Sequence, residues 1–240
     1  MANTRRVVGA LLSNASHALS PSRVTLQGQA VALEPLQESH TEALYKHIGS
    51  AKDSWLWDYM FNEPPTDAEQ LKSLVASWAT SEDPLFWSIR VKTGPIQGIV
   101  GYISYLRITP AHRTIEIGNV MYSPALQRTT AATEAIYLLA RHAFRDLGYR
   151  RLEWKCDNLN EPSKKAAARY GFVFEGLFRQ HYIVKGRNRD TAWFAILDSE
   201  WLDGGLEKAF EQWLDASNFD ENGRQKKRLE EFRSAESRLT

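Results

Sequence analysis

The sequence predicts one α/β (α+β) domain with a mixed, mostly antiparallel central sheet flanked by helices. Between residues 85 and 122, short apolar segments separated by turns that contain Gly and Pro indicate strands joined as hairpins. Between residues 114 and 174, strand and helix patterns alternate, which requires a crossover connection. Hydrophobic residues make up 43% of the 240 residues, as expected of a globular protein with one sizeable core.

The individual elements follow from apolar periodicity, which differs between strands and helices. Up to residue 122 it predicts a strand pair or bent strand at 24–35, helices at 38–48 and 67–78, and strands at 85–91, 99–106 and 114–122. Beyond residue 122 it predicts a helix at 130–146, a strand at 151–157, a helix at 161–170, strands at 172–174 and 191–197, and a helix at 206–214. Gly148 and Gly171 stand where the helices before them should end.

Composition divides the chain into three parts. We expect a flexible N-terminal arm at 1–23, the folded domain at 24–201, and a helical, charged tail at 202–240. The arm lacks acidic residues, which is compatible with a mitochondrial presequence, although a short disordered or helical arm is the preferred interpretation. From residue 218 the tail is dense in both charges and has little to bury, which favours a solvated segment over a partner-binding helix.

Charge and cysteine content argue against several classes of function. The formal net charge is +1, whereas a nucleic-acid-binding domain is normally clearly basic. No apolar run approaches the ~20 residues that span a bilayer. The single cysteine excludes an intramolecular disulfide and a cysteine-cluster metal site, and the histidines lack metal-ligand spacing. We therefore expect a cytoplasmic monomer or homodimer with no metal, nucleic-acid or membrane partner.

The most informative segment runs from Tyr122 to Glu134, where an apolar strand enters a short loop and then a helix. The first helical turn consists of small residues, which let the backbone approach a ligand. The unpaired N–H groups and the dipole of a helix start attract anions, so the segment predicts a diphosphate site. Walker and Rossmann glycine motifs are both missing, which argues against ATP, GTP and NAD.

A series of short motifs extends from residue 26 to residue 201. They are Leu26-x-Gly28, Val31-x-Leu33-x-Pro35-Leu36, Glu116-Ile117-Gly118, Gln127-Arg128-Thr129-Thr130-Ala131-Ala132, Asn160-x-x-Ser163, Gly171-Phe172-x-Phe174-Glu175-Gly176, Arg179, Gly186, Asp190 and Glu200-Trp201. In this order and spacing they resemble the GNAT acetyltransferase superfamily, specifically its RimJ/RimL-like branch of N-acetyltransferases. The resemblance covers nearly the whole domain and implies a GNAT fold, splayed at the cofactor-binding strands.

Two residues depart from the pattern of that superfamily. Thr130 stands where glycine is usual, so the loop is built with a Cβ at this position, and the hydroxyls of Thr129 and Thr130 become possible phosphate donors. Ala167, four residues before Gly171, stands where many members have a catalytic tyrosine. Tyr170 falls in a different helical direction and does not replace it. These departures motivate an alternative, a non-catalytic acyl-CoA-binding module.

The resemblance implies that acetyl-CoA donates its acetyl group directly to a primary amine in a ternary complex, with no metal. Because alkyl amines are mostly protonated at about pH 7, the reaction needs a proton acceptor. Glu116 is the candidate base, directly or through a water, since burial would raise its pKa. The alternative is a structural carboxylate paired with Arg107 or Arg113. Weaker candidates for the base are His112 and His181.

The remaining candidates concern the cofactor. The strand backbone expected to pair with pantetheine is that of Val120, Met121 and Tyr122. The loop expected to bind the diphosphate, mainly through main-chain N–H groups, comprises Gln127, Arg128, Thr129, Thr130, Ala131 and Ala132. Asn160 is a candidate both for the helix N-cap and for a pantetheine contact, and Ser163 is expected beside the departing sulfur. Cys156 is expected in the core rather than as a nucleophile.

The resemblance implies that the segment connecting the first two helices shapes the acceptor cleft. The candidates there are Trp55, Trp57, Asp58 and Tyr59, since aromatic rings and carboxylates suit a cationic amine. For the tryptophans, packing in the core is the alternative. A small-molecule amine is the expected acceptor, because the near-neutral charge and the bulky aromatic segment favour a compact pocket. A protein or peptide N-terminus, as for RimJ and RimL, is the alternative.

Overall fold

The computed structural model describes residues 6–233 and is built around one eight-stranded sheet. The strands are β1 (Leu26–Gln27), β2 (Val31–Pro35), β3 (Leu85–Val91), β4 (Gly98–Thr109), β5 (Thr114–Tyr122), β6 (Arg151–Asp157), β7 (Val173–Val184) and β8 (Arg187–Leu197). Their order is β1-β2-β3-β4-β5-β6-β8-β7, and every neighbouring pair is antiparallel except β5 and β6. The prediction of a mixed, mostly antiparallel sheet is confirmed.

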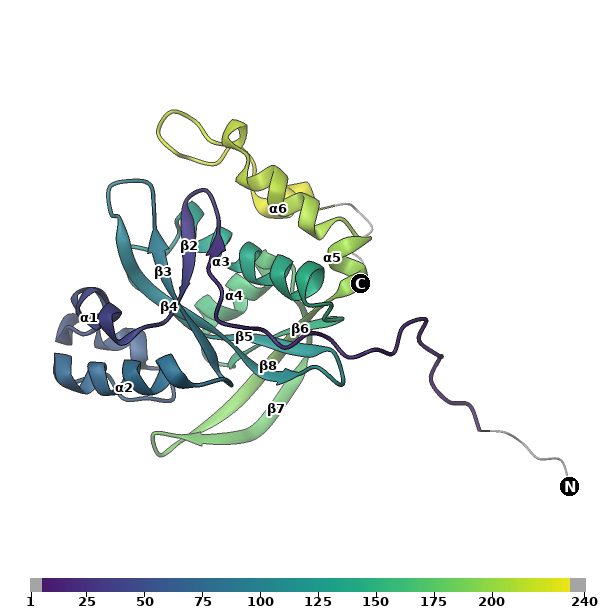
Figure 1. Cartoon of the computed structure of the whole chain (residues 1–240), viewed down its shortest axis with the longest axis horizontal. Helices are drawn as coiled ribbons and strands as arrows, with labels where there is room; N and C mark the ends of the chain where they lie inside the picture. Colours follow the sequence, from purple (N-terminus) through teal and green to yellow (C-terminus); the bar gives the residue numbers. More distant parts are fainter. Residues whose placement is uncertain (1–5, 234–240) are drawn as a thin grey trace, which may run out of the picture.

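Helices cover both faces of the sheet (Figure 1). They are α1 (Thr41–Ile48), α2 (Ala68–Thr80), α3 (Thr130–Arg141), α4 (Glu161–Tyr170), α5 (Asp198–Leu202) and α6 (Leu206–Leu214), and a π-helical turn, His142–Asp146, extends α3. Helices α1 and α2 pack on one face with the 3-10 helix η2 (Ala51–Trp57), while α3, α4 and α6 lie on the other. Each face therefore has its own hydrophobic core.

The sheet splays where β5 and β6 run parallel. Their pairing extends only from Thr114 opposite Arg151 to Ile117 opposite Trp154. Beyond that point β5 continues to pair with β4, and β6 with β8, so the strands diverge. Backbone N–H and C=O groups on the facing edges are left without a strand partner, which is how an extended, amide-bearing ligand can be accommodated. The splay creates the opening in which the site lies.

Local sequence signals set the two helices beside this opening. Helix α3 begins after Thr129, whose side chain accepts the Ala132 N–H, and α4 begins after Asn160, whose side chain accepts the Ser163 N–H. Gly171 ends α4 in the left-handed conformation with φ of 95°, which a glycine adopts without strain. The predicted Asn160 cap is therefore present.

The C-terminal part of the described chain is more firmly packed than its composition suggests. Leu206, Phe210 and Trp213 of α6 belong to the core that α3 and α4 share, and Leu229 is fully buried there. Residues 220–228 are all exposed, whereas Phe219, Leu229 and Phe232 pack in or against this core. At the other end, the amides of Ala18 and Leu19 donate to Pro110 O and Leu147 O, 3.1 and 2.9 Å away. The domain limits at 24 and 201 remain predictions.

The last hairpin is much longer than the sequence predicts. Strands were expected only at 172–174 and 191–197, whereas β7 and β8 form a ribbon that extends to a turn at Lys185 and Gly186. Most β7 side chains are exposed or half-buried, so they carry no buried alternation for a periodicity argument to detect. Within residues 6–233, no helix has both the length and the apolar character needed to cross a membrane.

Candidate functional site

A single cavity of about 1570 Å³ opens at the splay between β5 and β6. Its walls come from β5, β6, the starts of α3 and α4, the segment after η2, and the β7–β8 ribbon. It brings together most of the residues predicted for the site, namely Glu116, Val120, Met121, Tyr122, Gln127, Arg128, Thr129, Thr130, Ala131, Ala132, Asn160, Ser163, Trp55, Asp58 and Tyr59. Strands and helices far apart in the sequence thus meet around one space.

The loop before α3 is held open by its own side chains. Gln127 Nε2 donates to Tyr122 O at 2.8 Å, which ties the loop to the end of β5. Thr129 Oγ1 donates to Leu126 O at 2.7 Å and accepts the Ala132 N–H at 3.2 Å. The N–H groups of Thr130 and Ala131 donate to no acceptor within residues 6–233. These N–H groups at the helix start are suited to bind an anion.

Thr130 is not the strained position in this loop. The left-handed residue is Arg128, with φ of 62°, whereas Thr130 is an ordinary first residue of α3. A Cβ at position 130 is therefore compatible with the backbone. The side-chain cap of α3 is made by its neighbour Thr129, which accepts the Ala132 N–H.

Replacing Thr129 with alanine is expected to lower the free energy of unfolding by about 1 kcal/mol, because the Ala132 N–H loses its cap. The matched change Thr130→Ala should leave stability nearly unchanged, since no side-chain hydrogen bond of Thr130 is present in the described chain. Urea unfolding of the two variants measures the difference. A larger loss in Thr130→Ala than in Thr129→Ala would contradict this assignment.

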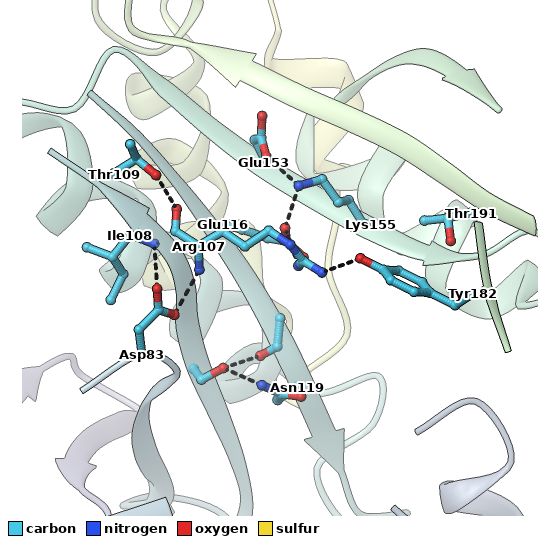
Figure 2. Close-up of polar contacts among 12 residues, drawn as sticks. Asp83, Arg107, Ile108, Thr109, Glu116, Asn119, Glu153, Lys155, Tyr182 and Thr191 are labelled. Carbon is cyan, nitrogen blue, oxygen red and sulfur yellow. Dashed lines mark hydrogen bonds and ion pairs between the residues drawn. The ribbon is translucent and has the colours of Figure 1, made fainter. Parts of the chain in front are cut away.

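Glu116 lies on β5 in the wall of the cavity and is only 3% exposed. Its Oε2 accepts from Arg107 Nη1 and from Lys155 Nζ, both at 2.8 Å (Figure 2). Burial raises the pKa of Glu116, and the two cations counteract part of that rise. The Arg107 pair of the structural alternative is thus present, while Arg113 instead donates to Gly148 O. The position in the cavity wall is compatible with both interpretations.

Lys155 is a member of this cluster that the sequence did not single out. Its side chain is 3% exposed, with Nζ 2.6 Å from Glu153 Oε2 and 3.8 Å from the centre of the Trp193 ring. The second cation, Arg107, also donates to the hydroxyl of Tyr182 at 3.1 Å (Figure 2). Strand alternation places Lys155 on the face opposite Trp154 and Cys156, but sequence gives no sign of its partners.

Ser163 and Cys156 meet at the start of α4. Ser163 Oγ accepts from Trp154 Nε1 at 3.0 Å, and its backbone N–H donates to Asn160 Oδ1 at 3.1 Å. Burial raises the pKa of the Cys156 thiol, and a hydrogen bond with Ser163 lowers it in part. A buried thiol with a raised pKa is a poor nucleophile, in agreement with a packing role for Cys156.

The predicted acceptor residues divide between the cavity and the core. Trp55 and Asp58 line the cavity, and so does Tyr59, whose hydroxyl donates to Leu159 O at 3.1 Å across to the loop before α4. Trp57 lies elsewhere: it is fully buried in the core beneath α1 and α2, and its Nε1 donates to Ile48 O. With no surface in the cavity, Trp57 is dropped from the acceptor-binding set.

Three other residues considered from the sequence lie outside the cavity lining. His112 is exposed and His181 is half-buried, and neither lines the cavity. Ala167 is fully buried in the core, so the position of the usual tyrosine is occupied by packing. Among residues 6–233 no group of three or more His, Cys, Asp or Glu side chains is placed to hold a metal ion.

Comparison with known proteins places this chain among the acetyltransferases. Residues 31–173, more than half of the chain, match the family model described as an acetyltransferase (GNAT) domain. The crystal structure of a GCN5-related N-acetyltransferase from Brucella melitensis is 43% identical, with a TM-score of 0.87, over 92% of this chain and 99% of that one.

Two curated proteins are more distant in sequence. The ribosomal-protein-serine acetyltransferase of Escherichia coli (strain K12) is 25% identical over 72% of this chain and 96% of its own length. The uncharacterized N-acetyltransferase YnaD of Bacillus subtilis (strain 168) is 31% identical over 104 residues, which span 43% of this chain and 59% of that protein. All three proteins are named as acetyltransferases.

Proposed function

We propose a direct acetyl transfer in the cavity between β5 and β6, starting from one premise: the chain belongs to the GNAT family and is an acetyl-CoA-dependent N-acetyltransferase. The observation that carries the proposal is the continuous cavity, because it joins the open start of α3 to the carboxylate of Glu116. A bound acetyl-CoA and an amine can therefore meet in one space.

In the proposed complex the diphosphate lies at the N–H groups of Thr130 and Ala131. Pantetheine extends along the free edge of β5 at Val120 to Tyr122, where its amides replace the missing strand partner. Asn160 and Ser163, at the start of α4, border the path of pantetheine from the other side. The thioester is thereby held between β5 and α4, close to Glu116.

The reaction forms one bond and breaks one bond. The neutral amine attacks the thioester carbon, the C–N bond forms, and the C–S bond breaks as coenzyme A leaves. The proton lost by the amine passes to Glu116, directly or through a water, and the Ser163 hydroxyl donates a hydrogen bond to the departing sulfur. Ser163 Oγ accepts from Trp154 Nε1, so its hydroxyl hydrogen remains to be donated either to Cys156 or to the departing sulfur.

The proposed acceptor is a small-molecule amine. The Tyr59 bond to Leu159 O and the Lys185 bond to Trp57 O tie η2 and the residues after it to the loop before α4 and to the β7–β8 turn, which favours a fixed pocket over an open peptide channel. A protein N-terminus is the second candidate, supported by the name of the E. coli relative.

The single buried cysteine also supports a cytoplasmic location.

Release of free thiol from acetyl-CoA, measured against a panel of amines, amino acids and short peptides, tests the proposal. We expect thiol release that depends on the acceptor and is matched by one acetylated amine per thiol. A preference for peptides over every small amine would select the second candidate. Thermal stabilisation by coenzyme A, combined with no thiol release on the whole panel, would contradict catalysis and support a binding module.

A further inference from the structure

Arg189 on β8 is a buried cation with no ion-pair partner in the described part of the chain. The residue is 7% exposed, and within residues 6–233 its only side-chain hydrogen bond runs from Nε to Thr191 Oγ1 at 3.3 Å. Among residues 6–233 no carboxylate lies within 4.0 Å of its guanidinium, whereas the neighbouring cations Arg107 and Lys155 are both paired with Glu116. Burying an unpaired charge is costly, so this arrangement calls for an explanation.

The open side of the Arg189 guanidinium is the cavity. Its terminal nitrogens donate to no acceptor in the described chain. They are nevertheless not sealed off from solvent, because they are absent from the set of fully inaccessible polar atoms without a partner. Since Arg189 lines the cavity, these nitrogens keep their accessible surface there. The guanidinium is also stacked 4.9 Å from the Phe61 ring and 5.8 Å from the Tyr182 ring, which hold it in place.

Among residues 6–233 the acidic groups nearest Arg189 are engaged with other partners. Burial lowers the pKa of the guanidinium, and the carboxylate of Asp157 offsets only part of this effect. Asp157 Oδ1 instead accepts the Leu159 N–H at 2.9 Å. Glu116, which also faces this part of the cavity, already accepts from two cations. The free N–H groups of such a planar guanidinium can bind both oxygens of a carboxylate that comes from outside the chain.

Arg189 belongs to the acceptor end of the cavity. It pairs with Tyr182 across the β7–β8 ribbon and stacks on Phe61, which continues the segment of Trp55, Asp58 and Tyr59. Arg107 and Lys155 lie near Arg189, and all three cations add to the effect of burial in lowering the pKa of His181, but Arg107 and Lys155 share the carboxylate of Glu116. Within residues 6–233, Arg189 is the member of this group of cations that has no carboxylate partner.

We propose that Arg189 binds a carboxylate of the acceptor, so that the substrate is an amine that also carries a carboxylate. This inference rests on the proposed transfer to an amine. The carboxylate could belong to a free α-amino acid or to an acidic side chain near a peptide N-terminus. Both sources present the same planar anion, and the acceptors used in the test separate them.

Binding of the acetylated product tests the site without requiring turnover. The probes are the N-acetyl forms of the twenty amino acids, each with its carboxamide, and N-acetyl tripeptide amides with Asp or Glu at the second position, each with its Asn or Gln counterpart. Calorimetry is done on the full chain saturated with coenzyme A. We expect at least one carboxylate to bind about tenfold or more tightly than its amide, and Arg189→Gln to reduce this ratio to about twofold or less.

The control is Arg187→Gln, which removes the same charge from an exposed residue of β8 outside the cavity lining and should keep the full preference. Arg189→Lys keeps the charge without the fork and provides a second variant if Arg189→Gln fails to fold; it should bind the carboxylate more weakly than the wild type. Equal binding of every carboxylate and its amide, or a preference that survives in Arg189→Gln, would overturn the site. Carboxylate-selective binding without thiol release would instead count against catalysis alone.

Discussion

Glu116→Gln is expected to lower kcat by about 10²- to 10³-fold while the Kd for coenzyme A stays within about twofold. The amide has the shape of the carboxylate but cannot take the proton of the attacking amine. Coenzyme A binding should persist because the proposed diphosphate and pantetheine contacts are made by backbone groups of other residues. Steady-state kinetics and calorimetry on the same preparations measure both quantities.

The pH dependence of kcat/KM should show the ionisation of Glu116. A base must be deprotonated, and burial raises the pKa of Glu116 above its ordinary value of 4.5. Activity is therefore expected at pH values above the raised pKa and to fall as pH decreases through it. In Glu116→Gln this acidic limb of the kcat/KM profile should be absent, whatever activity remains.

Glu153→Gln is the matched control for Glu116. Glu153 pairs with the same Lys155 but does not line the cavity, so its loss disturbs the ion cluster without touching the proposed reaction. Glu116→Gln should fold because Lys155 keeps Glu153 and the partly exposed Arg107 can be hydrated. Equal losses of kcat in the two variants would mean that Glu116 acts through structure rather than as the base.

Glu134→Ala is expected to lower the free energy of unfolding by about 3 kcal/mol. The buried carboxylate on α3 accepts three backbone N–H groups, those of Gln29, Ala30 and Val31, at 2.6, 2.7 and 2.9 Å. These bonds attach the turn between β1 and β2 to the helix that opens the site. Removing the carboxylate leaves three N–H groups without their acceptor.

Chemical unfolding of Glu134→Ala beside Glu211→Ala measures this effect. Glu211 on α6 is exposed, and within residues 6–233 its side chain accepts only from the hydroxyl of Tyr137, so its loss should cost less than about 1 kcal/mol. If the two variants lost the same stability, the role of Glu134 as acceptor of three hydrogen bonds would be contradicted.

The sequence alone gave no reason to choose Glu134, because its partners lie more than a hundred residues away.

Elements with a buried stripe could be predicted from the sequence, and exposed or charged elements could not. Strand β6 and helix α3 were found because alternation and helical spacing record which side chains are buried. Strand β7 shows little apolar alternation in its sequence, because its side chains remain largely outside the core. Leu229 was missed for a different reason: one apolar residue among many charges has no periodicity, although it completes the core.

The same distinction holds for the candidate site. The loop before α3 and the Asn160 cap depend on neighbours within a few residues, so the sequence predicts their geometry. The pairing of Lys155 with Glu116, and the isolation of Arg189, depend on strands brought together by the fold. A cluster of aromatic residues in the sequence indicates a region of contact but not which way each side chain points. The structure places Trp57 in the core.

Intact-mass analysis of the protein mixed with acetyl-CoA, first without and then with an acceptor amine, tests direct transfer at this cavity most directly. Without acceptor we predict no acetylated protein and no stoichiometric release of thiol, because the buried Cys156 is not a nucleophile in this account. With acceptor, thiol and acetylated amine should appear together in equal amounts. A stable acetyl group on the protein before the amine is added, transferred when the amine arrives, would contradict the account.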